Sequence, residues 1–387
     1  MSEGGDGATG DEGGGLYDQR WQTQAKHDLL RAYLEPFAFK VLQVYGSLDF
    51  VDGFAGPWKS RDEAGFRDTS FGIAVDVLDG VMRRLTEMDR PVRIRCVFNE
   101  LDPAAFARLE GYVVEAQLRH PGLELHALQG EFAANALRID ELCRHAFRLV
   151  YVDPTGWTGY PRDALRQVVP RGRRAEVMIN FMSAFARRFL VSPADRRERW
   201  LDEMLGPERA ARLRGQQAAE ETIRRAVAGV LREELGLSYV CETPIAASDA
   251  RSVHFWMLYG TRSAAGVEVL RDAEVRALTR HETARDARRA GDQASLMELP
   301  AAGPYSAMRE EHLRTLQGQL VDALARIGPI TFGKLAARVM ARRHLRKIEV
   351  KDAVARLAEA GRVEPSWRTR NPRTHGPGND DMITLVD

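Results

Sequence analysis

Short apolar segments alternate with amphipathic segments through the first half of the chain, and this alternation constrains the fold more than any other feature. Five segments have the composition of buried strands: Leu48–Gly53, Pro91–Glu100, Leu123–Phe132, Phe147–Trp157 and Ala175–Met182. Helical periodicity occupies the intervals at Gln24–Tyr45, Ser70–Leu85, Pro103–Leu118, Ala133–His145 and Pro161–Val169. This alternation predicts a parallel sheet with helices on both faces. We expect Pro36 to end or bend the first helix, and Thr69 or Ser70 to cap the second.

Two further strands are predicted at Leu237–Ala246 and Ser252–Arg262, with a short turn between them that makes the pair antiparallel. A charged helical run at about 191–236 separates this pair from the fifth strand and predicts a helical insertion. Five strands alternating with helices, followed by an antiparallel pair, form the outline of class I methyltransferases. The sequence therefore predicts an α/β, Rossmann-like, seven-stranded sheet of this type, a similarity that concerns fold more than function.

Three regions follow from the change in composition along the chain. Residues 1–18 are rich in glycine and acidic residues and predict a disordered tail, and residues 19–300 form the α/β domain. Residues 305–387 contain three short helical patterns, at Glu311–Gly328, Ile330–His344 and Lys347–Gly361. Two extended pieces around a basic loop rich in proline and glycine come next. Three helices and a hairpin predict a winged helix-turn-helix domain.

Composition limits the classes of protein to consider. The chain has 387 residues, 44% of them hydrophobic, which is enough for a sizeable core, and its net charge is +1. Any contact with nucleic acid must therefore come from local patches. No apolar run approaches the ~20 residues of a membrane span, and the N-terminus lacks the pattern of a signal peptide. Cys96, Cys143 and Cys241 lie far apart and predict neither a metal site nor a disulfide framework. We expect a soluble cytoplasmic protein.

The first predicted strand runs into a turn formed by Asp52, Gly53, Phe54, Ala55 and Gly56. Ligands of open α/β sheets bind beyond the carboxyl ends of the strands, near the first strand-to-helix crossing. Gly53 and Gly56 would let a cofactor approach the backbone, and Asp52 would bond its amine or a nearby water. The G-x-G-x-x-G pattern of dinucleotide oxidoreductases is absent here, which disfavours that class. The alternative is a tight turn in a domain that binds no nucleotide.

Acidic residues also end the second and third strands. Glu100 is placed to accept both hydroxyls of a ribose, and Glu131 lies where methyltransferases of this class often place an acidic residue near the adenine amine. Each has a simpler alternative. Glu100 would be a solvated carboxylate before a helix capped by Asp102 and Pro103, and Glu131 would start a helix, where negative charge is favoured.

Asp153 and Pro154 end the fourth strand, and Trp157 follows. The pattern resembles the Asp-Pro-Pro-aromatic motif of enzymes that methylate amino groups in nucleic acids, with Thr155 and Gly156 in place of the second proline and the aromatic residue. In such a site the carboxylate and a loop carbonyl accept hydrogen bonds from an exocyclic amine and hold its lone pair toward a methyl sulfonium. An aromatic ring stacks on the base. The alternative is an Asp-Pro turn that only orders a loop.

Five stretches together resemble the three-Cys-motif partner family, TcmP: KHDLLRAYL, FVDGFAGPW, YVDPTGW, EVMINFMSAFARRF and FWMLYGTRSAAGVEVLRDA. They occur in order across most of the chain from Trp21 to about Ala273. The resemblance implies a class I methyltransferase-like domain and a neighbouring Cys-rich partner protein that resembles radical-SAM enzymes. Relatives usually have Gly-Pro-Gly where this chain has Gly56, Pro57 and Trp58. A tryptophan there would narrow the cofactor pocket, stack on the adenine or substrate, or block the site.

The C-terminal region carries the residues expected to contact nucleic acid: Lys334, Arg338, Arg342, Arg343, Arg346, Arg368 and Arg370. A basic helix with a basic wing fits phosphate contacts that flank a groove. The alternative is a solvated helix face on a protein-binding module.

Two functions follow as hypotheses. The first is an S-adenosylmethionine-dependent methyltransferase that acts on a nucleic acid or a nucleobase-containing substrate. The second is a non-catalytic, methyltransferase-like binding module that serves the Cys-rich partner.

Overall fold

The computed structural model describes residues 12–56, 60, 62, 65–154, 159–182, 197–216, 219–246, 253–292, 303–369 and 373–386. At 12–20, 197–199, 254 and 287–292 it describes the backbone only. Among the helices formed by these residues, none combines the length and the apolar character needed to cross a membrane.

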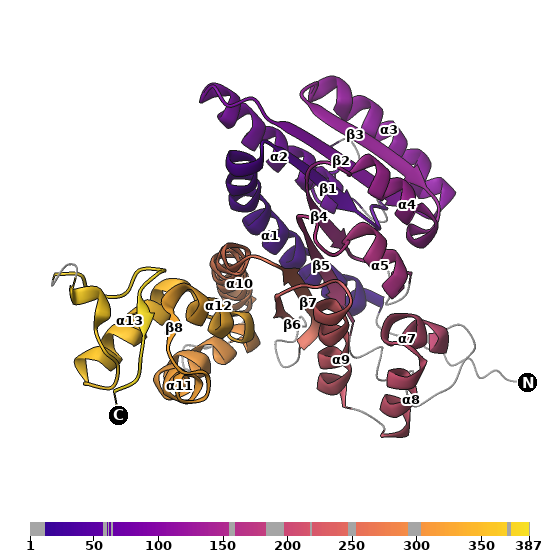
Figure 1. Cartoon of the computed structure of the whole chain (residues 1–387). Helices are drawn as coiled ribbons and strands as arrows, with labels where there is room; N and C mark the ends of the chain where they lie inside the picture. Colours follow the sequence, from indigo (N-terminus) through magenta and orange to yellow (C-terminus); the bar gives the residue numbers. More distant parts are fainter. Residues whose placement is uncertain are drawn as a thin grey trace, which may run out of the picture.

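A seven-stranded sheet forms the centre of the molecule (Figure 1). Its strands are β1 (Ser47–Asp52), β2 (Arg93–Glu100), β3 (Leu123–Gln129), β4 (Phe147–Val152), β5 (Ala175–Phe181), β6 (Tyr239–Ala246) and β7 (Val253–Thr261). They lie in the order β3-β2-β1-β4-β5-β7-β6. The first five are parallel, and β7 runs antiparallel to both β5 and β6. The predicted α/β, Rossmann-like sheet is confirmed.

Helices cover both faces of the sheet because its inner strands are apolar on both sides. Leu48 and Phe50 of β1 join one buried cluster, and Val51 joins the other. The first face carries α1 (Glu12–Tyr45), α2 (Ser70–Glu87), α3 (Pro103–Arg119) and α10 (Ala264–Asp292). The second carries α4 (Phe132–Leu142), α5 (Arg162–Val168), α7 (Arg197–Leu205), α8 (Pro207–Gly215) and α9 (Glu220–Glu233). The last three helices lie in the stretch predicted as a helical insertion.

Helix α1 begins at Glu12 and continues through Pro36 to Tyr45. The sequence predicted that Pro36 would end or bend this helix. Pro36 does not end it, and a bend there stays a prediction. Proline removes one backbone hydrogen bond from a helix. Here Tyr33 and Phe37, on either side of Pro36, are buried in the main apolar cluster. Packing on both sides of the proline thus offsets the lost bond. At α2 the prediction is confirmed, since the Thr69 side chain caps the helix by accepting from the backbone N–H of Gly72 at 3.2 Å.

The C-terminal region packs against the β6 edge of the sheet (Figure 1). It contains α11 (Pro304–Ile327), β8 (Ile330–Thr331), α12 (Phe332–Arg342), α13 (Lys347–Glu359), a 3-10 helix (Ser366–Thr369) and β9 (Met382–Ile383). Strands β8 and β9 pair antiparallel, and an isolated bridge joins Val363 to Leu385. Helix α12 contacts both α10 and β6. The apolar cluster on the first face of the sheet therefore continues into this region without a break.

Candidate functional site

The acidic residues predicted as a site lie together at one edge of the sheet. The strand order reverses at the β1–β4 pair, with β2 and β3 on one side and β5 on the other. Such a reversal leaves a crevice beyond the carboxyl ends of the strands, where ligands of open α/β sheets bind. Asp52 ends β1, Glu100 ends β2, and Asp153 directly follows β4. We call these three residues the acidic edge.

Asp52 is fully buried with few compensating groups. Its carboxylate accepts hydrogen bonds from the Ser70 hydroxyl at 2.5 Å and from the Phe54 backbone N–H at 3.1 Å. Burial, reinforced by the negative charges of Asp153 and Glu100, outweighs these bonds and raises the pKa of Asp52 to about 7. The group therefore changes protonation near neutral pH. Buried titratable groups of this kind gather at functional sites.

The turn after β1 is fixed to both neighbouring strands. Gly53 donates its N–H to the carbonyl of Tyr151 at 2.9 Å, and Ala55 donates to the carbonyl of Asn99 at 2.8 Å. A Cβ on Gly53 would lie 2.9 Å from the ring of Phe132. The space on the Cβ side of this glycine is therefore filled by a side chain of α4, and the approach of a cofactor to the Gly53 backbone stays a prediction.

Glu100 and its neighbour Asn99 organise the end of β2. Glu100 is 4% exposed and accepts the backbone N–H of Asp102 at 2.7 Å. Burial raises the pKa of the Glu100 carboxyl above its ordinary value. Asn99, which the sequence reasoning missed, donates to the carbonyls of Gly53 and Gly130, at 3.2 and 3.0 Å. Glu131 is exposed and makes no side-chain cap to α4, so its proximity to a bound adenine stays a prediction.

Asp153 has a full set of partners. Both of its oxygens accept from Lys26 Nζ, each at 2.8 Å, and Asn180 and the Tyr151 hydroxyl donate at 2.7 and 3.2 Å. Burial would raise the pKa of Asp153, but the charge and hydrogen bonds of Lys26, helped by Asn180, lower it. The carboxylate is therefore ionised and held in place. Pro154 beside it is buried.

Helix α1 supplies two site residues that had no assigned role. Lys26 is 8% exposed and reaches from the first half of α1 to the acidic edge. The next residue, His27, has its pKa lowered to about 4, mainly by burial and then by the charge of Lys26. Both belong to the stretch KHDLLRAYL, which carried the family resemblance. That stretch was the available signal, because nothing else in the sequence places α1 beside β4.

Two polar atoms near the acidic edge are buried without a hydrogen-bond partner in the described part of the chain. They are the Asn180 side-chain oxygen and the Tyr160 hydroxyl. The Tyr160 ring also makes an edge contact with Phe54, their centroids 6.4 Å apart. Unsatisfied buried polar atoms are costly, and a bound ligand is one way to satisfy them.

Gly56, at the end of the turn that follows β1, is half-buried. Trp58 and Trp157 lie outside the described residues.

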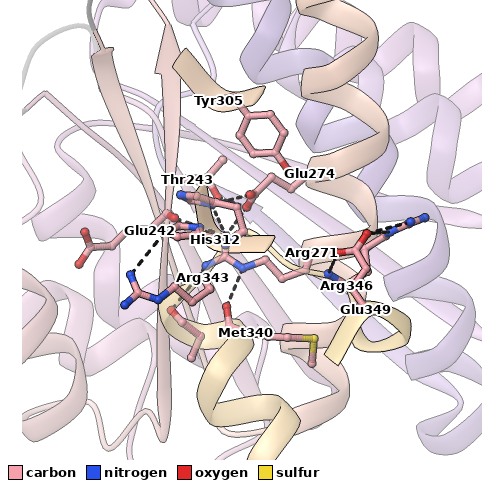
Figure 2. A network of polar contacts seen from close by, with 12 residues as sticks. Glu242, Thr243, Arg271, Glu274, Tyr305, His312, Met340, Arg343, Arg346 and Glu349 are labelled. Carbon is pink, nitrogen blue, oxygen red and sulfur yellow. Dashed lines mark hydrogen bonds and ion pairs between the residues drawn. The ribbon is translucent and has the colours of Figure 1, made fainter. Parts of the chain in front are cut away.

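A second polar centre lies where α10, α12 and β6 pack together (Figure 2). Arg271 forms an ion pair with Glu274 and donates to the Met340 carbonyl at 2.8 Å. Glu274 also accepts from the Thr243 hydroxyl at 2.6 Å and contacts His344 Nδ1 at 2.7 Å. We call Arg271, Glu274 and His344 the junction triad. All three are buried, so the triad joins the α/β domain to the C-terminal region.

The residues predicted to contact nucleic acid fall into three groups. Lys334, Arg338 and Arg342 are exposed on α12, one turn apart, and none of the three forms an ion pair within the described ranges. The second group is already engaged. Arg343 donates to Gln319 at 2.9 Å, Arg346 pairs with Glu349 at 2.9 Å, and Arg368 lies 3.8 Å from Glu359. The third is Arg370, which lies outside the described residues.

Comparison with known proteins adds no assignment. A scan against models of protein families finds no match, and a search of curated proteins finds none either. Within the described parts of the chain, no group of three or more His, Cys, Asp or Glu side chains is placed to hold a metal ion.

Proposed function

We propose that the α/β domain is a class I methyltransferase fold that binds S-adenosylmethionine at the acidic edge and methylates a nucleic acid or nucleobase-containing substrate. The observation that carries this proposal is the pair of buried carboxyls, Asp52 and Glu100, on adjacent strands beside the point of strand reversal. Carboxylates at such positions hold the ribose and amine groups of nucleotide-type cofactors. The cofactor would supply an electrophilic methyl group.

Fold and fit both support the cofactor assignment. Five parallel strands followed by an antiparallel pair match the methyltransferase outline, and this agrees with the resemblance to three-Cys-motif partner proteins. Asn180 and Tyr160 each bring a buried polar atom without a partner among the described residues, which a ligand with hydroxyl and amino groups would satisfy. On this proposal Asp52 and Glu100 hold the cofactor.

The substrate side of the proposal centres on Asp153. Its present partners, Lys26 and Asn180, show that two or more donors can reach this carboxylate at once. An exocyclic amine would replace one of them, with Pro154 shaping the turn and Trp157 assigned to stacking. Direct transfer needs mainly accurate positioning of the acceptor, and a carboxylate fixed by Lys26 provides this.

The C-terminal region is proposed to be a winged helix-turn-helix that contributes nucleic-acid contacts. Helices α11, α12 and α13, the β8–β9 pair and the bridge from Val363 to Leu385 support this assignment. The exposed face of α12 provides cations that are free of ion pairs within the described ranges, at Lys334, Arg338 and Arg342. Such cations suit phosphate contacts, which are independent of sequence.

Calorimetric titration of the full chain with S-adenosylmethionine tests the proposal. We expect binding, and Glu100→Ala should weaken it by about 1–3 kcal/mol, the cost of leaving buried hydroxyls unpaired. Glu115→Ala is the matched control, since this exposed glutamate lies in the second half of α3, away from the carboxyl end of β2, and should change affinity less. Asp153→Ala should retain most cofactor affinity and lose methyl transfer. Absence of binding by the unmutated protein would overturn the assignment.

One observation favours the second function, a non-catalytic module that serves a Cys-rich, radical-SAM-like partner. Lys26 occupies both oxygens of Asp153, so the residue proposed to bind the acceptor is already neutralised by the chain itself. On this alternative the ion pair is structural and attaches α1 to β4. Cofactor binding without methylation of RNA, DNA or nucleotides, together with a stable complex with the partner, would favour it.

A further inference from the structure

A cavity of about 580 Å³ lies between the β6 edge of the sheet and the C-terminal region. Helix α9 contributes arginines to its wall, β6 and β7 contribute Glu242 and Trp256, and the end of α12 contributes Arg342 and Arg343. We call this the α9–α12 cavity. Its volume lies within the range of roughly 300–1,000 Å³ that is typical of small-molecule sites. The acidic edge lies on β2, β1 and β4, on one side of β5, whereas this cavity lies beside β7 and β6, on the other side. The two are therefore separate sites.

The wall of this cavity carries an excess of positive charge. Six arginines line it, against two glutamates. Each glutamate has its own arginine partner: Glu242 pairs with Arg224 at 2.5 Å, and Glu221 with Arg225 at 2.5 Å. The acids on the wall are thus neutralised locally, and they do not compensate the remaining guanidinium groups.

Three arginines of the wall are left without an acidic partner among the described residues. Arg232 and Arg342 are exposed and make no side-chain hydrogen bond or ion pair within those ranges. Arg343 donates to a neutral group, the Gln319 side chain, at 2.9 Å. Arg271, the sixth, belongs to the junction triad, where Glu274 compensates it (Figure 2).

Two further features of the wall bear on anion binding: one arginine is held in place, and one histidine is neutral. The guanidinium of Arg224 lies 3.7 Å from the Trp256 ring centre while its Nε bonds Glu242, so this arginine is held rigidly. His312 lines the same cavity, and its pKa is lowered to about 4, first by burial and then by the positive charges of His344, Arg343 and Arg271. The part of this shift that comes from the neighbouring positive charges is the part that a bound anion would relieve.

We propose that the α9–α12 cavity binds the phosphate groups of a nucleotide, either free or at the end of a nucleic acid. Guanidinium groups match phosphate oxygens with paired hydrogen bonds, and several of them around one cavity favour a multiply charged anion over a single carboxylate. Val240, Met308 and Ala341 give the wall an apolar part, against which a sugar or base can lie. The site is independent of methyl transfer and exists equally in a non-catalytic module.

Titration of the full chain with ADP, and with a short RNA carrying either a 5′-phosphate or a 5′-hydroxyl, tests this proposal. We expect ADP, the phosphorylated RNA or both to bind, and Arg232→Ala with Arg342→Ala to weaken that binding by about tenfold or more. Both side chains are exposed and without ion pairs in the described ranges, so the variant should fold normally. Binding of ADP identifies a free nucleotide as the ligand. Binding only of the phosphorylated RNA identifies a nucleic-acid end.

Two single substitutions serve as matched controls for lost charge. Arg326→Ala removes an exposed cation from α11, outside the cavity wall, and Arg90→Ala removes one from the loop between α2 and β2. Both should leave ADP affinity, and the preference for a 5′-phosphate, within about twofold of the unmutated protein. Failure of all the phosphate probes to bind, or equal loss in the controls, would overturn the proposal. S-adenosylmethionine titration of the same variants should be unchanged, which separates this result from the test of the acidic edge.

Discussion

The acidic edge and the junction triad bury charged groups to a similar extent, with opposite electrostatic outcomes. Asp52 and Glu274 are both 0% exposed. Burial acts on both in the same direction, and it raises the pKa of Asp52 to about 7. For Glu274 the effect of burial is outweighed by the charges of Arg271 and His344, and the pKa is lowered to about 2. The partners of a buried carboxyl, more than its burial, thus determine whether it is ionised at neutral pH.

This contrast separates buried charges that compensate one another from a buried carboxyl that lacks such compensation. In the junction triad each group satisfies another, and the result is a fixed contact between β6, α10 and α12. At the acidic edge, Asp52 has only a hydroxyl and a backbone N–H, and two carboxylates nearby oppose its ionisation. Such an uncompensated carboxyl is consistent with the proposal that Asp52 holds a ligand.

The largest expected effect is the loss of a partner in the junction triad. Glu274→Ala leaves Arg271 buried without its carboxylate, and removal of one member of a buried ion pair costs about 3–5 kcal/mol. Urea unfolding of the full chain measures this change in the free energy of unfolding. The control is Glu221→Ala on α9, whose partner Arg225 is exposed, where we expect about 0.3–0.5 kcal/mol. Equal losses in the two variants would contradict the structural role given to the buried ion pair of the junction triad.

A smaller effect of opposite sign is expected at the acidic edge. The pKa of Asp52 is raised from 3.8 to about 7, so the folded state favours the protonated carboxyl. This contribution to stability is complete below pH 4 and is lost as the pH rises to about 7. Asp52→Asn cannot ionise, and should therefore gain about 1–3 kcal/mol over the unmutated protein across this window. Unfolding measured from pH 4 to 8 checks the trend.

The junction triad supplies the control for this pH dependence. Since the pKa of Glu274 is lowered from 4.5 to about 2, its stabilising effect is present above pH 4.5 and is lost as the pH falls toward 2. Glu274→Gln should therefore cost more stability as the pH rises from 2 to 4.5, and a constant amount above. An Asp52→Asn difference that does not change between pH 4 and 7 would contradict the assigned state of Asp52.

The sequence predicted the sheet well because local patterns determine it. Apolar runs and helical periodicity give the strands and helices, and chain order gives the parallel part. Whether the helix would end at Pro36 stayed open because packing on both sides of a proline is a tertiary effect. At the site, Asp52, Glu100 and Asp153 follow from their place at strand ends. Lys26 could not be paired with Asp153, because the two residues are 127 positions apart.

The basic residues illustrate a second limit of prediction from sequence. Seven of them were expected to contact nucleic acid because they lie on a predicted basic helix and a predicted basic wing. Composition does not reveal that Arg346 is paired with Glu349, or that Arg342 and Arg343 line a cavity against β6 and α9. These pairings depend on how α12 docks onto the α/β domain. Docking is fixed by buried groups such as Arg271, which the sequence does not distinguish from surface arginines.

The smallest expected effect extends the comparison to exposed charge on α12. Lys334→Ala with Arg338→Ala should leave the free energy of unfolding within about 0.5 kcal/mol, because neither side chain has an ion-pair partner in the described parts of the chain. If both contact phosphates, the slope of log affinity for nucleic acid against log salt concentration should become shallower by about 0.7–0.9 for each.

The control is Arg346→Ala, which removes one positive charge from the same region. In the unmutated protein this arginine is paired with Glu349 at the start of α13. The variant should change the salt dependence less and the stability more, because the charge of Arg346 is already compensated within the fold. The change in salt dependence should be compared per charge removed. If Arg346→Ala changes it as much as Lys334→Ala with Arg338→Ala does, an ion pair within the chain does not keep an arginine from contacting phosphate.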